Sequence, residues 1–219
     1  MRCTLLGVFS ICLLVCAACG DKSVDPDTFT LPLTAFPHSI GTSWTYELTD
    51  STSDGSVARC TVVVMIADSV AYDCGQEDCT GTFQQIWELQ CDDMLDTVTV
   101  LYQHDSLHLR YPFVAISLFF PLELGKTWTA LYPTGTTETR AGVVEITTLE
   151  LNNDATPKCM IVAGTVSYDS GMGYLSIVKV APNIGIAGMD FMLWIDSTIY
   201  EIGAIDIHQK WELIDWDVD

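Results

Sequence analysis

Hydrophobic and polar residues alternate with a period of two along most of the chain after position 43. Residues 44–48 alternate strictly, and residues 57–67 contain a β-branched apolar run. Such patterns predict half-buried and buried strands. Asp54-Gly55 between these segments is a hairpin signal. Further strands are predicted at 83–90, 96–103, 107–113, 141–151, 159–168, 174–180, 184–195, 198–207 and 210–216.

A helical period is almost absent from the chain. The best helix candidate, residues 114–118, is short and rich in β-branched residues, which favour strands over helices. Ten to twelve strands with short connections predict an all-β fold. We expect one large curved antiparallel sheet, either a half-barrel or a sandwich-like arrangement.

One sequence frame occurs twice, 84 positions apart. Phe-Pro-x-x-x-Gly-x-x-Trp-Thr begins at Phe36 and again at Phe120, and a looser Ala-Pro-x-x-Gly echo begins at Ala181. Proline fixes φ, glycine permits a positive φ in the turn, and tryptophan can bury a large area where a strand begins. The repeat therefore predicts two similar halves, at about 31–118 and 119–219, each entered through such a corner.

The aromatic residues of these corners have two interpretations. The first is a packing device that joins each half to the sheet. The second is an apolar cleft that binds a ligand, lined by Trp44, Trp128, Phe36 and Phe120.

The repeated frame together with the late Ala-Pro-x-x-Gly resembles a widespread group of uncharacterised bacterial lipoproteins over most of residues 32–190. Related exported families resemble the half-barrel of the lipoprotein carriers LolA and LolB. That resemblance implies a curved antiparallel sheet with an apolar concave face, and it implies no specific activity.

The first eighteen residues resemble a signal peptide, because Arg2 precedes an apolar run too short to span a membrane. Ala17-Ala18-Cys19 resembles the end of a bacterial lipobox, with Cys16 where Leu, Val or Ile is usual. The resemblance implies a signal peptide at 1–18, an acylated Cys19 with a polar tether at 19–30, and one β domain at 31–219. Gly20 instead of Asp implies the outer membrane, on its periplasmic or surface side. The alternative is an ordinary secretory signal cut after Ala18.

The formal net charge of −20 excludes a basic surface for nucleic acid. The same charge repels anionic lipid head groups, so the acyl chains would hold the protein to the membrane. The expected partners are therefore the membrane, other envelope proteins or an apolar ligand.

Five cysteines follow Cys19, and outside the cytoplasm they can form disulfides. If Cys74 and Cys79 close a turn, the flanking strands pair so that residue 62 faces Cys91. Cys60 then lies close to Cys91 across the same strand pair, and a two-residue shift or a bulge would allow a bridge. The candidate pairs are Cys74–Cys79 and Cys60–Cys91, and Cys159 is left as a buried strand residue.

Two other groups of residues could form a metal or catalytic site, but their sequence signals are weak. Cys74 and Cys79 followed by His104 and His108 could supply zinc ligands, but two histidines on one strand would lie too far apart for one ion. A single Asp-Ser-Gly turn at 169–171 lacks the second copy that aspartic protease chemistry needs. We therefore expect no catalytic residue, no metal and no cofactor.

The C-terminal segment 211–219 alternates apolar and acidic residues, which predicts an edge strand protected by charge or, less simply, a partner-docking strand. We expect a non-enzymatic interaction or structural role in the cell envelope. The alternatives are a carrier or sensor of apolar ligands on a concave sheet face, and a hydrolase without a recognisable motif. A filled core favours the first, and an apolar cavity open to solvent favours the second.

Overall fold

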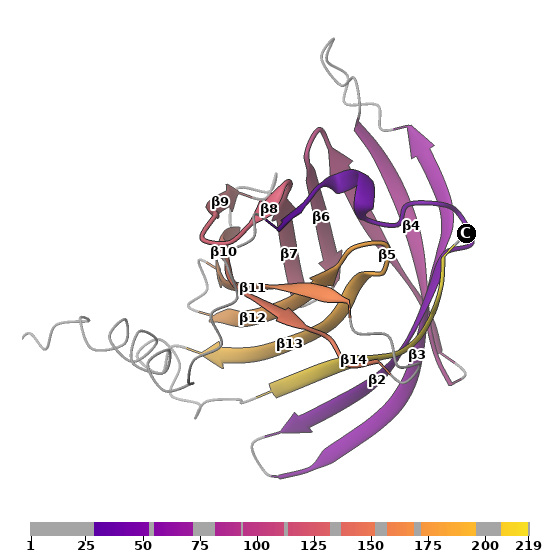
Figure 1. Cartoon of the computed structure of the whole chain (residues 1–219). Coiled ribbons are helices and arrows are strands. Elements are labelled where there is room, and N and C mark those ends of the chain that lie inside the picture. The colour runs from indigo at the N-terminus through magenta and orange to yellow at the C-terminus, as the bar shows by residue number, and fades with distance from the viewer. Residues whose placement is uncertain are drawn as a thin grey trace, which may run out of the picture.

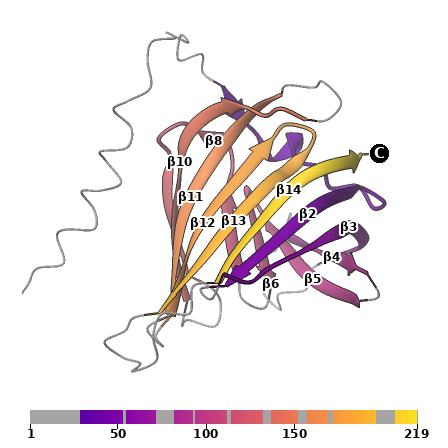
Figure 2. The same ribbon diagram turned by 90° about the horizontal axis from the view of Figure 1, so that it is seen from below.

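A computed structural model describes residues 29–52, 55–71, 82–92, 94–111, 114–131, 137–151, 157–168, 172–195 and 207–218. The predicted all-β fold is confirmed. Twelve antiparallel strands form one sheet that curls into a nearly closed barrel (Figure 1). Their order is β7-β6-β5-β4-β3-β2-β14-β13-β12-β11-β10-β9, and Figure 2 shows the curved sheet from β10 across to β5. No helix in the described part of the chain is long and apolar enough to cross a membrane.

The sheet consists of two six-stranded meanders, as the repeat predicts. The strands of the first are β2 (Ser43–Thr52), β3 (Val57–Ala71), β4 (Thr82–Cys91), β5 (Met94–Gln103), β6 (Ser106–Tyr111) and β7 (Val114–Phe119). The strands of the second are β9 (Thr127–Leu131), β10 (Thr137–Thr148), β11 (Lys158–Tyr168), β12 (Met172–Ala181), β13 (Gly185–Ile195) and β14 (Ile207–Asp217). A separate two-stranded sheet pairs β1 (Thr30–Leu31) with β8 (Leu122–Glu123), and a 3-10 turn, η2 (Leu33–Ala35), follows β1.

One prediction about local structure is wrong, and the one weak helix candidate is a strand. Residues 114–118 belong to β7, in keeping with their β-branched side chains. The C-terminal segment is not an edge strand, because β14 lies between β13 and β2 in the middle of the sheet. Its alternation separates two faces of one strand: Trp211 and Leu213 are buried while Glu212 is exposed. The predicted strand at 198–207 lies almost entirely outside the described residues.

The three sequence corners are confirmed as turns with a left-handed glycine. Gly41, Gly125 and Gly185 have φ values of 97°, 82° and 85°. Trp44 and Trp128 are each the second residue of the strand that follows, β2 and β9. The three corners lie at the same end of the barrel, because β2, β9 and β13 all begin there.

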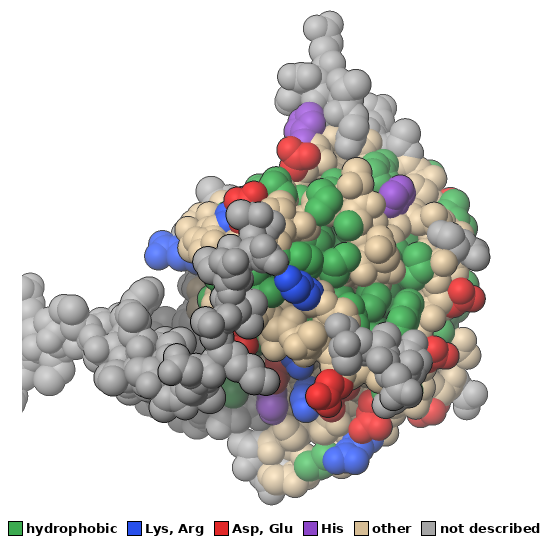
Figure 3. Space-filling model, viewed as in Figure 1, with side chains coloured by type: hydrophobic (Ala, Val, Ile, Leu, Met, Phe, Trp, Pro, Cys, Tyr) green, Lys and Arg blue, Asp and Glu red, His purple; other side chains and the backbone are tan. Residues whose placement is uncertain are grey.

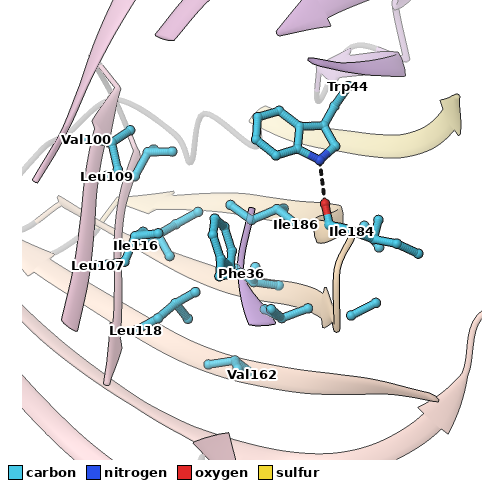
Figure 4. Packing of buried hydrophobic residues seen from close by; sticks show 14 of the residues in the cluster. Phe36, Trp44, Val100, Leu107, Leu109, Ile116, Leu118, Val162, Ile184 and Ile186 are labelled. Atoms are coloured by element: carbon cyan, nitrogen blue, oxygen red, sulfur yellow. Dashed lines mark hydrogen bonds between the residues drawn. The ribbon is translucent and has the colours of Figure 1, made fainter. Parts of the chain in front are cut away.

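These corners fill one end of the barrel, which we call the filled end. The Phe36 and Phe120 rings meet edge to face with centroids 6.1 Å apart. The Trp44 indole N–H donates to the carbonyl oxygen of Ile184, and the Asn183 backbone N–H donates to Ala35 O at 2.7 Å. Figure 4 shows Phe36 between side chains of β6 and β7 and those of β13. The N-terminal segment therefore closes this end from inside.

The last gap in the barrel lies between β7 and β9, the two edges of the sheet. The Trp128 indole N–H donates to the carbonyl oxygen of Ser117 at 2.9 Å, and the Phe119 and Trp128 rings lie 6.0 Å apart. Side chains thus span a seam that no backbone ladder closes.

Candidate functional site

The other end of the barrel, which we call the open end, contains two adjoining pockets. It lies where β2 and β4 end and where β3, β5 and β14 begin. An inner pocket of about 40 Å³ continues into a mouth pocket of about 460 Å³, and Leu89, Gln209 and Trp211 line both. The mouth pocket falls within the range of ordinary small-molecule sites, roughly 300–1,000 Å³.

The inner pocket has an almost entirely apolar wall. Strand alternation turns one face of each strand inward, so side chains from seven strands converge there. The lining side chains are Tyr46, Val64, Trp87, Leu89, Val98, Leu109, Ile186, Met189, Phe191, Gln209 and Trp211. Tyr46 is fixed in this wall, because its hydroxyl donates to Ile186 O at 2.6 Å and its ring meets Trp211 edge to face at 5.9 Å. Burial raises the pKa of Tyr46, so this hydroxyl stays protonated.

The mouth pocket is bounded by polar and acidic side chains. Asp50 continues the inward face that carries Trp44, Tyr46 and Leu48, and it lies opposite Gln209 on β14. The carboxylates of Asp92 and Asp96 also line this pocket. Among the described lining residues Arg59 is the one basic side chain, against the carboxylates of Asp50, Asp92 and Asp96, and its Nη1 lies 3.9 Å from Glu47 Oε1. The mouth is therefore acidic in front of an apolar interior.

Cys60 and Cys91 lie together on the wall of the mouth pocket. The predicted register is confirmed, because Val62 pairs with Cys91. Both cysteines are free thiols in this structure. Burial, the hydrogen bond with Cys91 and the negative charge of Asp92 and Asp50 raise the pKa of the Cys60 thiol to about 12. Cys60 is therefore a protonated thiol at neutral pH and a weak nucleophile.

The four aromatic residues proposed from sequence to line a cleft lie elsewhere. Phe36, Trp44 and Phe120 have 1%, 1% and 4% of their surface exposed and pack within the filled end. Trp128 lies at the seam. None of the four lines the inner or the mouth pocket. Their packing interpretation fits the structure, and the cleft is formed by other residues at the opposite end.

The other candidate residues from the sequence do not come together in one site. His104 has a φ of 50° in the β5–β6 turn, whereas His108 is held between the hydroxyls of Ser106 (2.9 Å) and Ser117 (3.0 Å). No group of three or more metal-ligating side chains occurs among the described residues. Cys159 is fully buried in β11, as predicted, and burial raises its pKa to about 11. Cys19, Cys74, Cys79 and the turn at 169–171 lie outside the described residues.

Sequence reasoning missed the inward-facing polar residues of the open end. One signal was present: Trp44, Tyr46 and Leu48 alternate toward the core, and Asp50 is the next residue of that same face. A carboxylate that continues an apolar face is costly to bury without a partner, and it marks the place where a core gives way to a site. Gln209 and Trp211 form the matching pair on β14, but only the pairing of β14 with β2 brings them beside Asp50.

Comparison with known proteins leaves the chain without an assigned family. No protein-family model matches the chain, and no curated protein matches it. Among solved structures, the chain is similar to the crystal structure of a candidate lipoprotein from Parabacteroides distasonis, at 9% sequence identity and a TM-score of 0.44. The match covers 84% of this chain and 98% of that chain.

Proposed function

We propose that this protein is a non-enzymatic binding protein for small apolar or amphipathic ligands, with its site at the open end of the barrel. The observation that carries the proposal is a mouth pocket of about 460 Å³ that adjoins the apolar inner pocket at Leu89, Gln209 and Trp211. Trp211 lines both pockets and Trp87 lines the inner one, and their indoles provide large, rigid apolar surfaces.

This proposal differs from the role favoured by sequence alone, an interaction or structural module. That role predicts a filled interior, and the interior is filled along much of the barrel, but the open end keeps two pockets. The carrier or sensor alternative predicts a continuous apolar cavity of several hundred Å³ open to solvent. The mouth pocket has that volume, although Asp50, Asp92 and Asp96 are among its lining residues, and the apolar inner pocket beside it is small. Figure 3, seen from the same side as Figure 1, shows hydrophobic side chains gathered on the face where η2 and β8 lie, which is the filled end.

We also propose that the chain is anchored through a lipidated Cys19, a proposal supported by the lipobox-like residues before it. The described chain begins at Phe29, and β1 then pairs with β8 beside the filled end. A tether on this segment would join the barrel at the end opposite the mouth, so the mouth would remain accessible. Radiolabelled palmitate should enter the wild-type chain and the Cys16→Ala variant, but not Cys19→Ala. Equal labelling of Cys19→Ala would refute the anchor.

Ligand binding is tested with 1-octanol, which joins one eight-carbon chain to a small uncharged head group. The purified full chain is titrated while the indole N–H signals are followed by NMR. The Leu89→Trp variant places bulk where the two pockets join, and Val63→Trp places the same bulk on an exposed outward position of β3 as a control. We expect at least about tenfold weaker binding for Leu89→Trp and no change for Val63→Trp. Unchanged binding by Leu89→Trp, or no binding by the wild type, would contradict the proposal.

A further inference from the structure

The wall of the open end carries two buried polar atoms without a partner. In the described part of the chain, four buried side-chain atoms lack a hydrogen-bond partner. Two of them, Asp50 Oδ1 and Trp211 Nε1, belong to residues that line the mouth pocket. The other two, Thr42 Oγ1 and Tyr102 Oη, belong to residues that line neither pocket. Buried polar groups normally have a hydrogen-bond partner, so the two atoms at the mouth without one require an explanation.

Trp211 differs in this respect from the other indoles of the interior. Trp87 donates to Gln85 Oε1 at 3.0 Å, and Trp128 donates to Ser117 O at 2.9 Å. Trp44 donates to Ile184 O. Trp211 is only 6% exposed, yet its N–H has no acceptor among the described residues. Of these four indole N–H groups, the one without an acceptor is therefore the one on the pocket wall.

Asp50 supplies the complementary group, an acceptor. It is the next residue after Leu48 on the inward face of β2, and Leu48 lies directly opposite Trp211 on the neighbouring strand β14. Asp50 and Trp211 are thus diagonal neighbours on one face, where side chains can reach the same bound molecule. A buried carboxylate oxygen is best matched by a charged N–H donor, because charge-assisted hydrogen bonds are the stronger kind.

The charge of the mouth selects the same kind of ligand. Asp50, Asp92 and Asp96 line the mouth pocket, whereas Arg59 is beside Glu47. An anionic head group at this mouth would be repelled and a cationic one attracted. The aromatic face of Trp211 is a further surface that attracts cations.

From these contacts we infer that the open end is selective for amphipathic amines, whose alkyl part packs in the mouth pocket against Leu89 and Trp211 while the ammonium group binds Asp50. This inference rests on the proposed function and names its ligand class. The indole N–H of Trp211 is left to hydrogen-bond to an oxygen of the ligand or to water held in the pocket.

The test uses three probes of equal chain length, octylamine, 1-octanol and octanoate, against the purified full chain at neutral pH. We expect octylamine to bind about tenfold tighter than 1-octanol, and octanoate to bind weakest. Asp50→Asn should remove the advantage of octylamine over 1-octanol, and circular dichroism of the variant shows whether it is folded. Asp217→Asn, an exposed carboxylate outside both pockets, is the matched control and should behave as the wild type.

The outcomes distinguish the inference from the proposed function. Equal affinity for octylamine and 1-octanol would overturn the selectivity for amines and leave the binding function standing. An advantage of octylamine that survives Asp50→Asn would overturn the role of Asp50. No binding of any probe would overturn both the inference and the proposed function.

Discussion

The two ends of this barrel are built from the same strands and differ in what fills them. At the filled end, residues 30–42 and the three corners bring Phe36, Trp44 and Phe120 together with almost no exposed surface. At the open end, the same strands carry Asp50, Cys60, Cys91 and Gln209 on their inward faces around a mouth pocket of about 460 Å³.

The difference shows that a single strand can contribute to close packing at one end of the barrel and to a pocket at the other. The inward face of β2 runs from Trp44, whose indole N–H is paired, to Asp50, which has an unpaired buried oxygen. Hydrogen-bonded polar groups and close packing stabilise a fold. Polar groups without a partner on a pocket wall can instead form hydrogen bonds with a ligand. The filled end should therefore carry stability and the open end should carry binding.

The largest expected effect comes from removing a tryptophan at each end. Trp44→Ala should lower the free energy of unfolding by about 3–5 kcal/mol, because it empties a closed site and leaves Ile184 O without its donor. Trp211→Ala should cost at least about 1 kcal/mol less, because it breaks no hydrogen bond and its space adjoins an open pocket. Urea unfolding followed by circular dichroism measures both values. Equal losses would remove the distinction between the two ends.

A disulfide between Cys60 and Cys91 would stabilise the open end of the barrel. The contact between Cys60 and Cys91 predicts that a disulfide oxidant such as oxidised glutathione joins them, with the thiols losing two protons and two electrons to the oxidant. We expect the bridge to raise the free energy of unfolding by about 2–4 kcal/mol. Peptide mass spectrometry after alkylation detects the linked peptides, and Cys159→Ala serves as a control. Complete alkylation of both cysteines after oxidation would count against the pair.

Glycine substitutions separate backbone strain from packing at the filled end. Gly125 and Gly185 have nearly the same φ, 82° and 85°. A Cβ at Gly185 would come within 3.3 Å of Phe36 Cζ and Pro37 Cδ, whereas nothing lies within 4 Å of one at Gly125. Gly125→Ala should cost about 1–2 kcal/mol from conformation alone, and Gly185→Ala about 1–3 kcal/mol more from overpacking. Thermal unfolding of the two variants gives the difference. If they unfold alike, the third corner is not packed against the first.

The smallest expected effect is a pH dependence at the filled end. Burial lowers the pKa of His108 below its usual 6.5. The unfolded chain then binds a proton more readily than the folded one, so the stability from His108 is complete above pH 6.5 and is lost as the pH falls toward the folded pKa. His108→Gln should flatten this part of the profile of unfolding free energy against pH. His104→Gln, exposed in the neighbouring turn, should leave it unchanged. A wild-type profile without this decline would contradict the assignment.

Much of the fold follows from local pattern. The period of two predicts most strands, because an inward and an outward face must alternate on a sheet with one side in water. Val62 pairs with Cys91, as placing the turn between Cys74 and Cys79 predicts, but a bulge between Ile66 and Asp68 shifts the pairs nearer the turn by one residue. The site was missed because the same pattern does not say how much volume the inward side chains leave empty. The cleft was assigned to Trp44 and Trp128, although large aromatic residues at strand roots are as well suited to filling space.

The amino-acid sequence by itself determined most of the strands, the two similar halves and the three glycine corners. The period of two, the repeated frame and the turn glycines can all be recognised along the chain without knowing which strands pair. Tertiary structure alone decided three further features. The pairing of β14 with β2 makes the C-terminal strand central and not an edge. The curvature of the sheet brings the corners at 36, 120 and 184 into contact. The open end stays hollow beside Asp50 and Trp211, because the sum of inward side-chain volumes depends on strands that meet only in the closed sheet.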